Sequence, residues 1–546
     1  MKRMLQKSKT KKLVVVVAVL TLWIGNSSFT NNFFEIAKQI EIFTTLFKEL
    51  NMNYVDETNP GDLMDTAIKS MLDDLDPYTK FLNEQDVEAF RISNSGEYSG
   101  IGATVRTYKD KVVIVEAYQG YPADQAGLKA GDVIVSIDGS DLSTYEGNAS
   151  DLLKGARNTE VNLVYRRQGK EINTTVGRAN VEVDAVPFYA LADDKTGYIA
   201  LTRFNRKASA QTKEALIDLK AEGAERIVLD LRGNPGGLLS EAIEIVNLFV
   251  PQGELIVTTR SKVKKFNREY RTKNMPVDLD IPLAILVDGR SASASEIVSG
   301  GLQDLDRGVV IGARSFGKGL VQRPLKLTYG TQLKVTISRY YTPSGRCIQA
   351  LDYWNRDENG KAVRNNEFQN FKTRSGRTVQ DGGGVLPEIL VADTQINDFI
   401  RSLEGTELLF DFATDFYYRN SFDQVGDFTF SDQDYKSFKA FAKKKGVQVN
   451  TSTEGLLKKA KETPNELMTD EVLAAFENLE KKFQEEKLNA LDTYRLPIQK
   501  ILEEELLKRY FYRKGLYSYY LQKDAVIQEA RSVLADSKRY EALLKP

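Results

Sequence analysis

The period of hydrophobic and polar positions changes several times along the chain, and each change predicts a different kind of structure. From Phe33 to about Phe90 the apolar residues recur every three or four positions, the spacing of one helix face. The clearest of them are Phe33, Ile36, Ile40, Phe43 and Phe47. A second helix is predicted from Leu63 to Leu75, just before the turn-prone Asp76-Pro77. We therefore expect a helical N-terminal region over residues 31–92.

A basic segment precedes this region and is followed by an almost wholly apolar run, Leu13 to Gly25. The run is short for a membrane span and has the length of a signal-peptide core. No clear small-x-small cleavage site follows, so residues 1–30 fit either a cleaved signal peptide or an uncleaved membrane anchor. Both predict export, with the basic flank of an anchor left in the cytoplasm.

From about Tyr98 the pattern becomes that of short strands and tight turns. The predicted elements are a glycine-rich start (Ser99–Val105), a strand (Val112–Ala117), a short helix (Pro122–Gly127), a strand with its turn (Gly131–Gly139) and a later strand (Val161–Arg166). In combination they resemble a PDZ domain, which we expect over residues 93–182.

This resemblance implies a mode of peptide binding. Gly100, Ile101, Gly102 and Ala103 match the loop whose backbone N–H groups hold the C-terminal carboxylate of a peptide, and the adjacent strand then pairs with the peptide backbone. Taken alone, the same glycines would be an ordinary turn. The expected partners are therefore unstructured C-terminal tails of other proteins.

Between Tyr198 and Pro343 strands alternate with helices, which predicts an α/β layout with functional sites at the carboxyl ends of the strands. Two turns follow buried strands in this part of the chain, Gly233–Gly237 and Asp288–Ser295. After about Ala392 the pattern is helical throughout and contains no chemical cluster. We expect residues 396–546 to form a helical C-terminal region.

The amino-acid composition excludes several classes of catalytic and metal-binding site. The chain has 546 residues, enough for three or four domains, and 75 basic against 76 acidic side chains, which gives no case for nucleic-acid binding. There is no histidine, so a Ser-His-Asp triad, a Cys-His dyad and any histidine-ligated metal are excluded. The single cysteine, Cys347, excludes an intrachain disulfide and a cysteine zinc cluster, and we expect it to be an incidental thiol. No metal and no cofactor are predicted.

The stretch from Asp288 to Gln322 holds the strongest candidates. Ser293 follows a buried strand and starts a helix, where free N–H groups could stabilise an oxyanion. Ser293 and Glu296 also fit a capping box, which is a purely structural motif. Lys318 stands between two glycines, and without histidine a Ser-Lys dyad is the remaining route to an activated serine.

The segment from Gly312 to Lys318 also fits the glycine-rich phosphate loop of nucleotide hydrolases. That motif requires Ser or Thr next and then a helix, whereas here Gly319 follows and Pro324 interrupts any helix. Nucleotide binding is therefore disfavoured.

Ser293 in SASASE, Lys318 in SFGKG and Gln322 together resemble the C-terminal processing, or tail-specific, serine proteases. Three further segments support the resemblance: LDLRGNPGG, RYYTPSGR and GGGVLPEI, at residues 229–237, 339–346 and 382–389. It covers about residues 35–395 and implies a protease core over 183–395 with an α/β, crotonase-like layout and an inserted PDZ domain. The region after 395 lies outside it and leaves a homo-oligomer contact open.

The resemblance implies a role for each residue. Ser293 attacks the peptide carbonyl, while Lys318 takes its proton and returns it to the leaving amine. Gln322 orients Lys318 through a side-chain hydrogen bond. The oxyanion is held by the N–H groups of Ala294 and of Gly236 or Gly237. Ser291 and Ser295 are fallback nucleophiles, and the spacing to Lys318 favours Ser293.

The expected protein is an exported serine endopeptidase of the periplasm or cell envelope, held by an N-terminal anchor if the signal is not cleaved. It would cut proteins at or near C-termini that the PDZ domain captures. The alternative is a non-catalytic PDZ scaffold built on a degenerate protease core.

Overall fold

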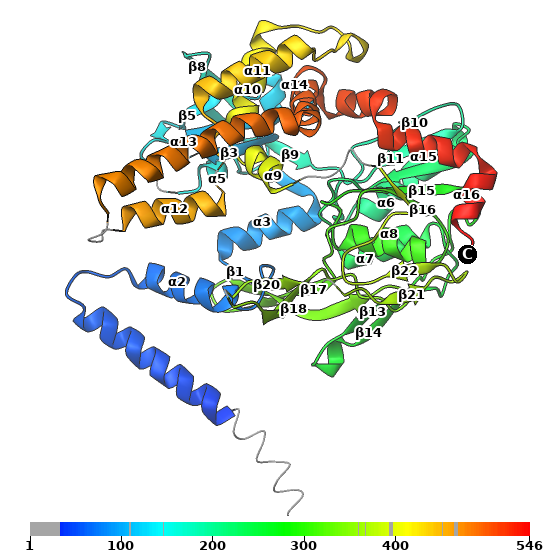
Figure 1. Ribbon diagram of the computed structural model, residues 1–546, viewed down its shortest axis with the longest axis horizontal. Coiled ribbons are helices and arrows are strands. Elements are labelled where there is room, and N and C mark those ends of the chain that lie inside the picture. Colours follow the sequence, from blue (N-terminus) through cyan, green and yellow to red (C-terminus); the bar gives the residue numbers. More distant parts are fainter. Residues whose placement is uncertain are drawn as a thin grey trace, which may run out of the picture. The chain divides into compact units, whose positions relative to one another are not determined.

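The computed structural model describes residues 33–108, 111–145, 147–358, 360–365, 367–391, 397–449, 451–463 and 468–546 (Figure 1). The predicted signal, residues 1–30, lies outside these ranges. The chain divides into two compact units between Phe81 and Leu82.

The first unit is helical. Residues 33–53 lie in a helix, and α2 spans Pro60–Asp73. The side chain of Asn59 caps α2 by accepting a hydrogen bond from the N–H of Gly61, and Pro60 fills the first helical position, where no N–H is needed. Among the described residues, no helix is long and apolar enough to cross a membrane. The predicted helical pattern of this region is confirmed.

The second unit starts with a helix and a small β-domain. Its elements are α3 (Glu84–Ser95), β2 (Glu97–Gly100), β3 (Ala103–Tyr108), β4 (Lys111–Ala117), α4 (Pro122–Gln125), β5 (Val133–Ile137), β6 (Ser140–Asp141), α5 (Ala149–Leu152), β7 (Glu160–Arg167), β8 (Lys170–Gly177) and β9 (Ala179–Glu182); a short strand, β1 (Lys80–Leu82), spans the boundary between the units. The main sheet has the order β3-β4-β5-β7-β8, so β3 is an edge strand of this sheet. Val161, Leu163 and Tyr165 alternate with more exposed residues along β7 and enter the core of the domain. This is the predicted PDZ domain.

A six-stranded sheet of order β10-β11-β12-β15-β16-β23 forms the centre of the next region. Its strands are β10 (Phe188–Leu191), β11 (Thr196–Ala200), β12 (Arg226–Asp230), β15 (Leu283–Val287), β16 (Val309–Gly312) and β23 (Ile389–Leu390). All neighbours from β11 to β23 are parallel, and β10 is antiparallel to β11. Both faces of a parallel sheet are normally buried, which is why its strands read as continuous apolar runs in the sequence.

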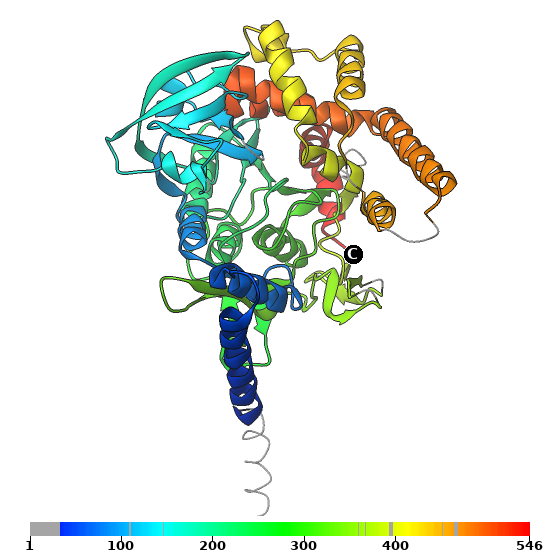
Figure 2. The same ribbon diagram turned by 90° about the vertical axis from the view of Figure 1, so that its left-hand side faces the viewer.

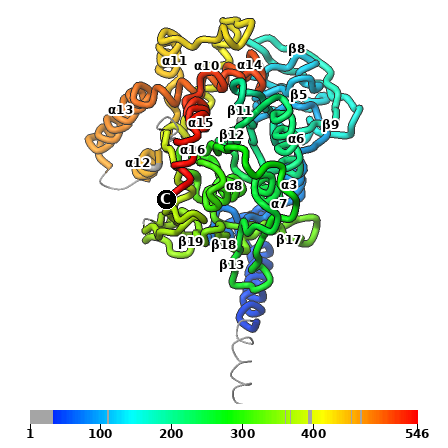
Figure 3. Tube along the Cα trace, turned by 90° about the vertical axis from the view of Figure 1, so that its right-hand side faces the viewer, coloured from blue at the N-terminus to red at the C-terminus, as the bar shows by residue number. Residues whose placement is uncertain are grey.

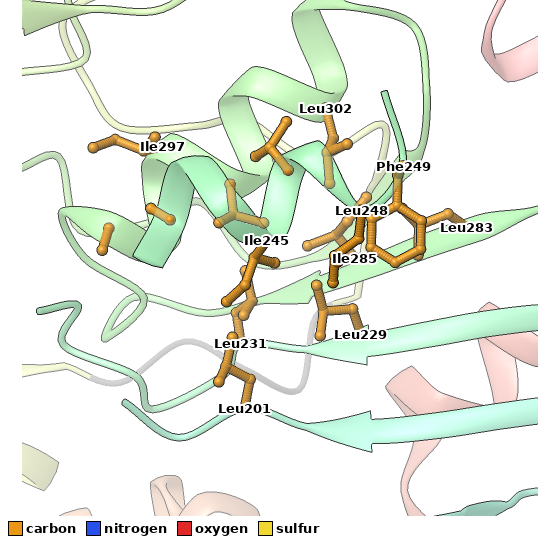
Figure 4. Packing of buried hydrophobic residues seen from close by; sticks show 14 of the residues in the cluster. Leu201, Leu229, Leu231, Ile245, Leu248, Phe249, Leu283, Ile285, Ile297 and Leu302 are labelled. Atoms are coloured by element: carbon orange, nitrogen blue, oxygen red, sulfur yellow. The ribbon is translucent and has the colours of Figure 1, made fainter. Parts of the chain in front are cut away.

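Helices from different parts of the chain cover the two faces of this sheet. On one face Leu229 and Ile285 pack with α7 (Leu239–Asn247) and α8 (Ala294–Asp304), as Figure 4 shows, and the same core includes α6 (Ala208–Ala221). On the other face Val228 and Leu286 pack against α15 (Ala525–Ala535) and α16 (Ser537–Leu543) (Figure 3). The last helices of the chain thus complete the α/β layers around the central sheet.

A second sheet contains β17 (Leu320–Lys326), the strand that begins directly after the Lys318 segment. In it β17 pairs with β18 (Gln332–Tyr341), β18 with β13 (Leu255–Arg260), and β13 with β14 (Arg268–Arg271). Smaller elements are η1 (Lys264–Phe266), β19 (Leu351–Arg356), β20 (Ala362–Arg364), β21 (Asn370–Lys372) and β22 (Thr378–Gln380).

The C-terminal region is helical, as predicted, and has its own apolar core. Its elements are α9 (Asp398–Glu404), α10 (Leu408–Arg419), η3 (Val425–Asp427), α11 (Asp432–Lys445), α12 (Ser452–Glu462), α13 (Asp470–Thr493) and α14 (Arg495–Lys523). Helix α14 is broken at Tyr512, whose φ is 57°. Beside this break the guanidinium of Arg513 makes two hydrogen bonds of 2.7 Å to Glu116 of the PDZ domain, and Figure 2 shows the cyan PDZ strands next to this part of α14.

Candidate functional site

Ser293 lies in the turn that joins β15 to α8 and is the N-cap residue of α8. Its φ is 55°, in the left-handed region, which costs a non-glycine residue about 1–3 kcal/mol and is kept only where surrounding contacts enforce it. Such strain clusters at active sites, and here it accompanies a side chain that is half-buried rather than enclosed.

The two neighbouring serines have structural contacts instead. Ser291 and Ser295 are completely buried, and their hydroxyls donate to the backbone carbonyls of Leu231 (2.8 Å) and Asn234 (2.9 Å). These bonds attach the Ser293 turn to the turn that follows β12. Of the three serines, Ser293 is therefore the one left accessible to a substrate.

The turn after β12 carries the two glycines predicted for the oxyanion hole. A Cβ on Gly236 would lie 2.6 Å from the carbonyl oxygen of Ala292 and 3.0 Å from the Cβ of Ser293, so only glycine permits this contact. The N–H of Gly236 donates to the Asn234 side chain (2.9 Å). The N–H groups of Gly237 and Ala294 have no acceptor within the described part of the chain. Of the three candidate donors, Gly237 and Ala294 are thus the two whose N–H groups are not already used by a described residue.

Lys318 lies in the loop between β16 and β17 and is half-buried. The glycines on either side permit close packing: a Cβ on Gly317 would be 2.5 Å from that of Ala350, and one on Gly319 would be 2.9 Å from the backbone nitrogen of Gln349. The strand β17 follows directly, whereas a phosphate-binding loop would continue as a helix.

Glu296 connects the loops of Ser293 and Lys318. Its side chain is fully buried, and one carboxylate oxygen accepts the N–H groups of Ser293 (2.7 Å) and Lys318 (2.9 Å). The other oxygen accepts the hydroxyl of Ser315 and the N–H of Gly317, both at 2.6 Å. Burial raises the pKa of Glu296 above its usual value, and these four donors oppose that shift. Sequence reasoning had assigned Glu296 only to a helix cap.

We predict that Glu296→Gln lowers both stability and activity. A glutamine has one acceptor oxygen, so two of the four donors would face an NH₂ group, and the free energy of unfolding should fall by about 2–5 kcal/mol. Denaturant midpoints and peptidase assays measure the two effects. Asp434 is the matched control, because it accepts from Ser431 in the same capping arrangement at the exposed start of α11. A Glu296 effect no larger than that of Asp434→Asn would contradict the connecting role.

Residues of the RYYTPSGR segment make hydrogen bonds and an ion pair to Ser293 and to helix α8, and Gln322 makes a hydrogen bond to the neighbouring strand. The hydroxyl of the buried Tyr340 donates to the backbone carbonyl of Ser293 (3.2 Å). The guanidinium of Arg346 is completely buried and pairs with Asp304 at 2.8 Å, near the end of α8. The side-chain amide of Gln322 donates to the hydroxyl of Thr336 (3.2 Å) on the neighbouring strand β18.

The turn after β12 is also anchored to the C-terminal helices. Arg232 forms hydrogen-bonded ion pairs with Asp230 (2.6 Å) and with Asp524 (2.8 Å), which is the N-cap residue of α15. Burial alone would raise the pKa of Asp524, but the charges of Arg232 and Lys500 outweigh it and hold that pKa well below its usual value. No sequence motif pointed to Asp524, because its partner is almost three hundred positions away.

The predicted peptide-binding residues lie in the PDZ domain at the start of its edge strand. Gly100, Ile101 and Gly102 are buried, while Ala103 opens β3 and is half-buried. Gly102 has a φ of 76°, and a Cβ there would collide with the side chain of Tyr121. The glycine is therefore required by both backbone conformation and packing.

Two further kinds of site remain to be placed, a reactive cysteine and a metal centre. Cys347 is largely enclosed beside Gly319, and burial raises the pKa of its thiol, so it is a poor nucleophile. Among the described residues, no group of three or more Cys, Asp or Glu side chains is placed to hold a metal ion.

Three family models match the chain. "Peptidase family S41" matches residues 195–353, a PDZ-domain model matches 113–167, and "Probable PDZ-protease, C-terminal helical domain" matches 399–534. The third match corrects the expectation that the region after 395 lies outside the family resemblance.

Individual relatives agree with these models. A "Carboxy-terminal-processing protease" of Bartonella bacilliformis is 34% identical over 344 residues, which are 62% of this chain and 79% of that protein. A "Probable CtpA-like serine protease" of Staphylococcus aureus is 33% identical over 310 residues, 56% of this chain and 61% of that protein. A solved photosystem II D1 C-terminal processing protease is 28% identical, with a TM-score of 0.36, covering 64% of this chain and 86% of that one. The extent of the match to the Bartonella protein, together with the peptidase and PDZ models, shows that this chain belongs to the carboxy-terminal-processing serine protease family.

Proposed function

We propose that the protein is an exported endopeptidase in which Ser293 and Lys318 form a catalytic dyad that cuts captured proteins at or near their C-termini. The observation that carries the proposal is the carboxylate of Glu296, because it binds the backbone N–H groups of both residues at 2.7 and 2.9 Å. Two loops that are separate in the sequence are thereby held at one point of the fold.

Each step of the reaction has a residue for it. The Ser293 hydroxyl attacks the scissile carbonyl carbon, and the neutral amine of Lys318 accepts the hydroxyl proton. The negative charge that develops on the carbonyl oxygen is met by the N–H groups of Ala294, at the positive end of α8, and of Gly237. Lys318 then protonates the leaving amine, and water releases the acyl group from Ser293 by the reverse sequence. In the proposed arrangement Gln322 orients the lysine side chain.

Substrate capture is proposed for the PDZ domain. The edge strand β3 can accept an added strand, and Gly100–Ala103 lies at its start, where a C-terminal carboxylate would be bound. The tail would be held there while an upstream peptide bond enters the Ser293 site. Export to the periplasm or cell envelope, with an N-terminal anchor if the signal stays uncleaved, rests on the apolar run at Leu13–Gly25.

The test is cleavage of a disordered protein with an apolar tail by purified protein lacking the first 30 residues. Wild type should shorten the substrate, as seen by mass spectrometry, and Ser293→Ala should abolish this. Ser240→Ala is the matched control, because Ser240 is exposed on the nearby helix α7. Cleavage that survives Ser293→Ala would overturn the assignment, and tail binding without turnover by wild type would favour the scaffold alternative.

A further inference from the structure

A cavity of about 580 Å³ adjoins the Gly236–Gly237 turn. Its lining comes from the segments at the carboxyl ends of β11, β12 and β15, from α14, and from the ends of α3 and α9. This volume is within the range of about 300–1,000 Å³ that is typical of ligand-binding clefts. The cavity therefore combines the proposed oxyanion turn with a surface from the C-terminal helices.

Basic side chains around the cavity are paired with carboxylates, with one exception. The pairs are Arg232–Asp524, Arg290–Glu404, Lys500–Asp524, Lys508–Glu505 and Arg513–Glu116. Within the described part of the chain, Arg203 has no acidic partner, and its Nε atom is buried without a hydrogen-bond acceptor. Burial, and then the charge of the nearby Arg513, hold the pKa of Arg203 below its usual value.

Arg203 is next in the chain to a residue that binds the proposed oxyanion turn. It lies in the loop between β11 and α6, and the next residue, Phe204, donates its N–H to the carbonyl of Gly236 (3.2 Å) and accepts the N–H of Leu238 (2.8 Å). Arg203 is thus one residue from the backbone that holds the proposed oxyanion turn. Its neighbour Arg513 is bound to Glu116 in the PDZ strand β4, so this part of the cavity also borders the PDZ domain.

We propose that Arg203 binds a carboxylate of the peptide substrate in this cavity, between the PDZ domain and the Ser293 site. The carboxylate is either an aspartate or glutamate side chain of a peptide whose C-terminus is held by the PDZ domain, or the free C-terminus of a peptide that is not held there. This inference rests on the proposed peptidase function and adds a specificity-determining residue to it.

The chemistry favours a carboxylate over a neutral group. A guanidinium presents a planar fork of donors that matches two carboxylate oxygens, and such charge-assisted hydrogen bonds are stronger in a partly desolvated site. A buried donor without an acceptor is unfavourable in the empty protein, so an arriving carboxylate satisfies a group that the fold leaves unsatisfied. Arg513 is already bound to Glu116 and cannot take this role.

Two pairs of short fluorogenic peptides test the proposal. The first pair has no acidic side chain and differs in ending with a free carboxylate or a carboxamide. The second pair is amidated and differs in carrying one glutamate or one glutamine. For each pair we compare kcat/KM of the peptide with the carboxylate to kcat/KM of the neutral peptide. In the pair that supplies the recognised carboxylate, Arg203→Gln should reduce this ratio by about 10- to 100-fold, mainly through KM. That fold-change corresponds to the loss of one hydrogen bond to a charged group. Arg203→Lys should lie between.

The ratio isolates Arg203, because any preference of the PDZ domain for a free carboxylate is the same in wild type and variant. Arg206→Gln is the matched control: Arg206 is exposed in the same loop and does not line the cavity. A fall in the first pair identifies the C-terminal carboxylate, and a fall in the second identifies an acidic side chain. Unchanged ratios in both pairs, with cleavage intact, would overturn the inference, whereas no cleavage by wild type would instead refute the proposed function.

Discussion

Lys318→Met is expected to lower kcat/KM for peptide cleavage by about 10³- to 10⁶-fold, the range seen when one member of a catalytic unit is removed. Methionine fills a similar volume but cannot accept the proton of Ser293, so the serine stays a weak nucleophile. The loss should appear in kcat more than in KM, since the amine is needed in the transition state rather than for binding. Steady-state kinetics on a fluorogenic tail peptide measure this.

Two further variants separate a base from a mere positive charge. Lys318→Arg keeps the charge, but a guanidinium does not give up its proton under these conditions, so it should be as inactive as the methionine variant. Lys326→Met is the matched control, because Lys326 is exposed at the far end of β17 and should leave kcat/KM unchanged. An active Lys318→Arg enzyme would show that Lys318 supplies charge and that another group is the base.

A chain that ends at Lys523 is expected not to fold its central sheet. Helix α15 covers one face of that sheet with the buried side chains of Val526, Ile527, Val533 and Leu534, and α16 adds Tyr540. Burying a side chain of this size contributes about 1.5–3 kcal/mol, so these four alone reach a sum comparable to the total stability of about 5–15 kcal/mol of a typical protein. Circular dichroism and size-exclusion chromatography of the truncated protein test this, and a folded monomer would contradict it.

A pair of adjacent substitutions makes the same point without a truncation. Val533 is fully buried against the sheet, and Val533→Asp would place an unpaired carboxyl group there at a cost of several kcal/mol. Ser532 is exposed on the same helix, and Ser532→Asp should leave the free energy of unfolding within about 0.5 kcal/mol of wild type. Equal effects of the two variants would show that α15 does not pack on the sheet in solution.

Much of the fold could be predicted from local pattern. The apolar runs at Arg226–Asp230 and Leu283–Val287 predict buried strands, because a strand of a sheet that is covered on both faces needs no alternation of apolar and polar residues. A turn follows each of these two runs. The PDZ domain could be predicted from the opposite pattern, alternation along β7 and glycines at positive φ such as Gly102. These features depend on neighbours within a few residues, which the sequence displays directly.

The function of a residue was harder to predict wherever its partners lie far away in the chain. Glu296 has the sequence signature of a helix cap, and only the fold shows that both of its carboxylate oxygens also accept N–H groups of the Lys318 loop. Helix α15 has an ordinary amphipathic pattern, and nothing in it names the sheet that it covers or the Arg232 side chain that Asp524 binds.

The sequence by itself determined most of the helices and strands of this protein. It also excluded catalysis and metal binding by histidine, and it indicated a serine and a lysine at turns as candidate catalytic residues. The tertiary structure decided which serine stays accessible, how one carboxylate joins the two candidate loops, and which arginine of the cavity has no carboxylate partner among the described residues. The physical reason is that burial and pairing are properties of all surrounding atoms, and most of those atoms come from other parts of the chain.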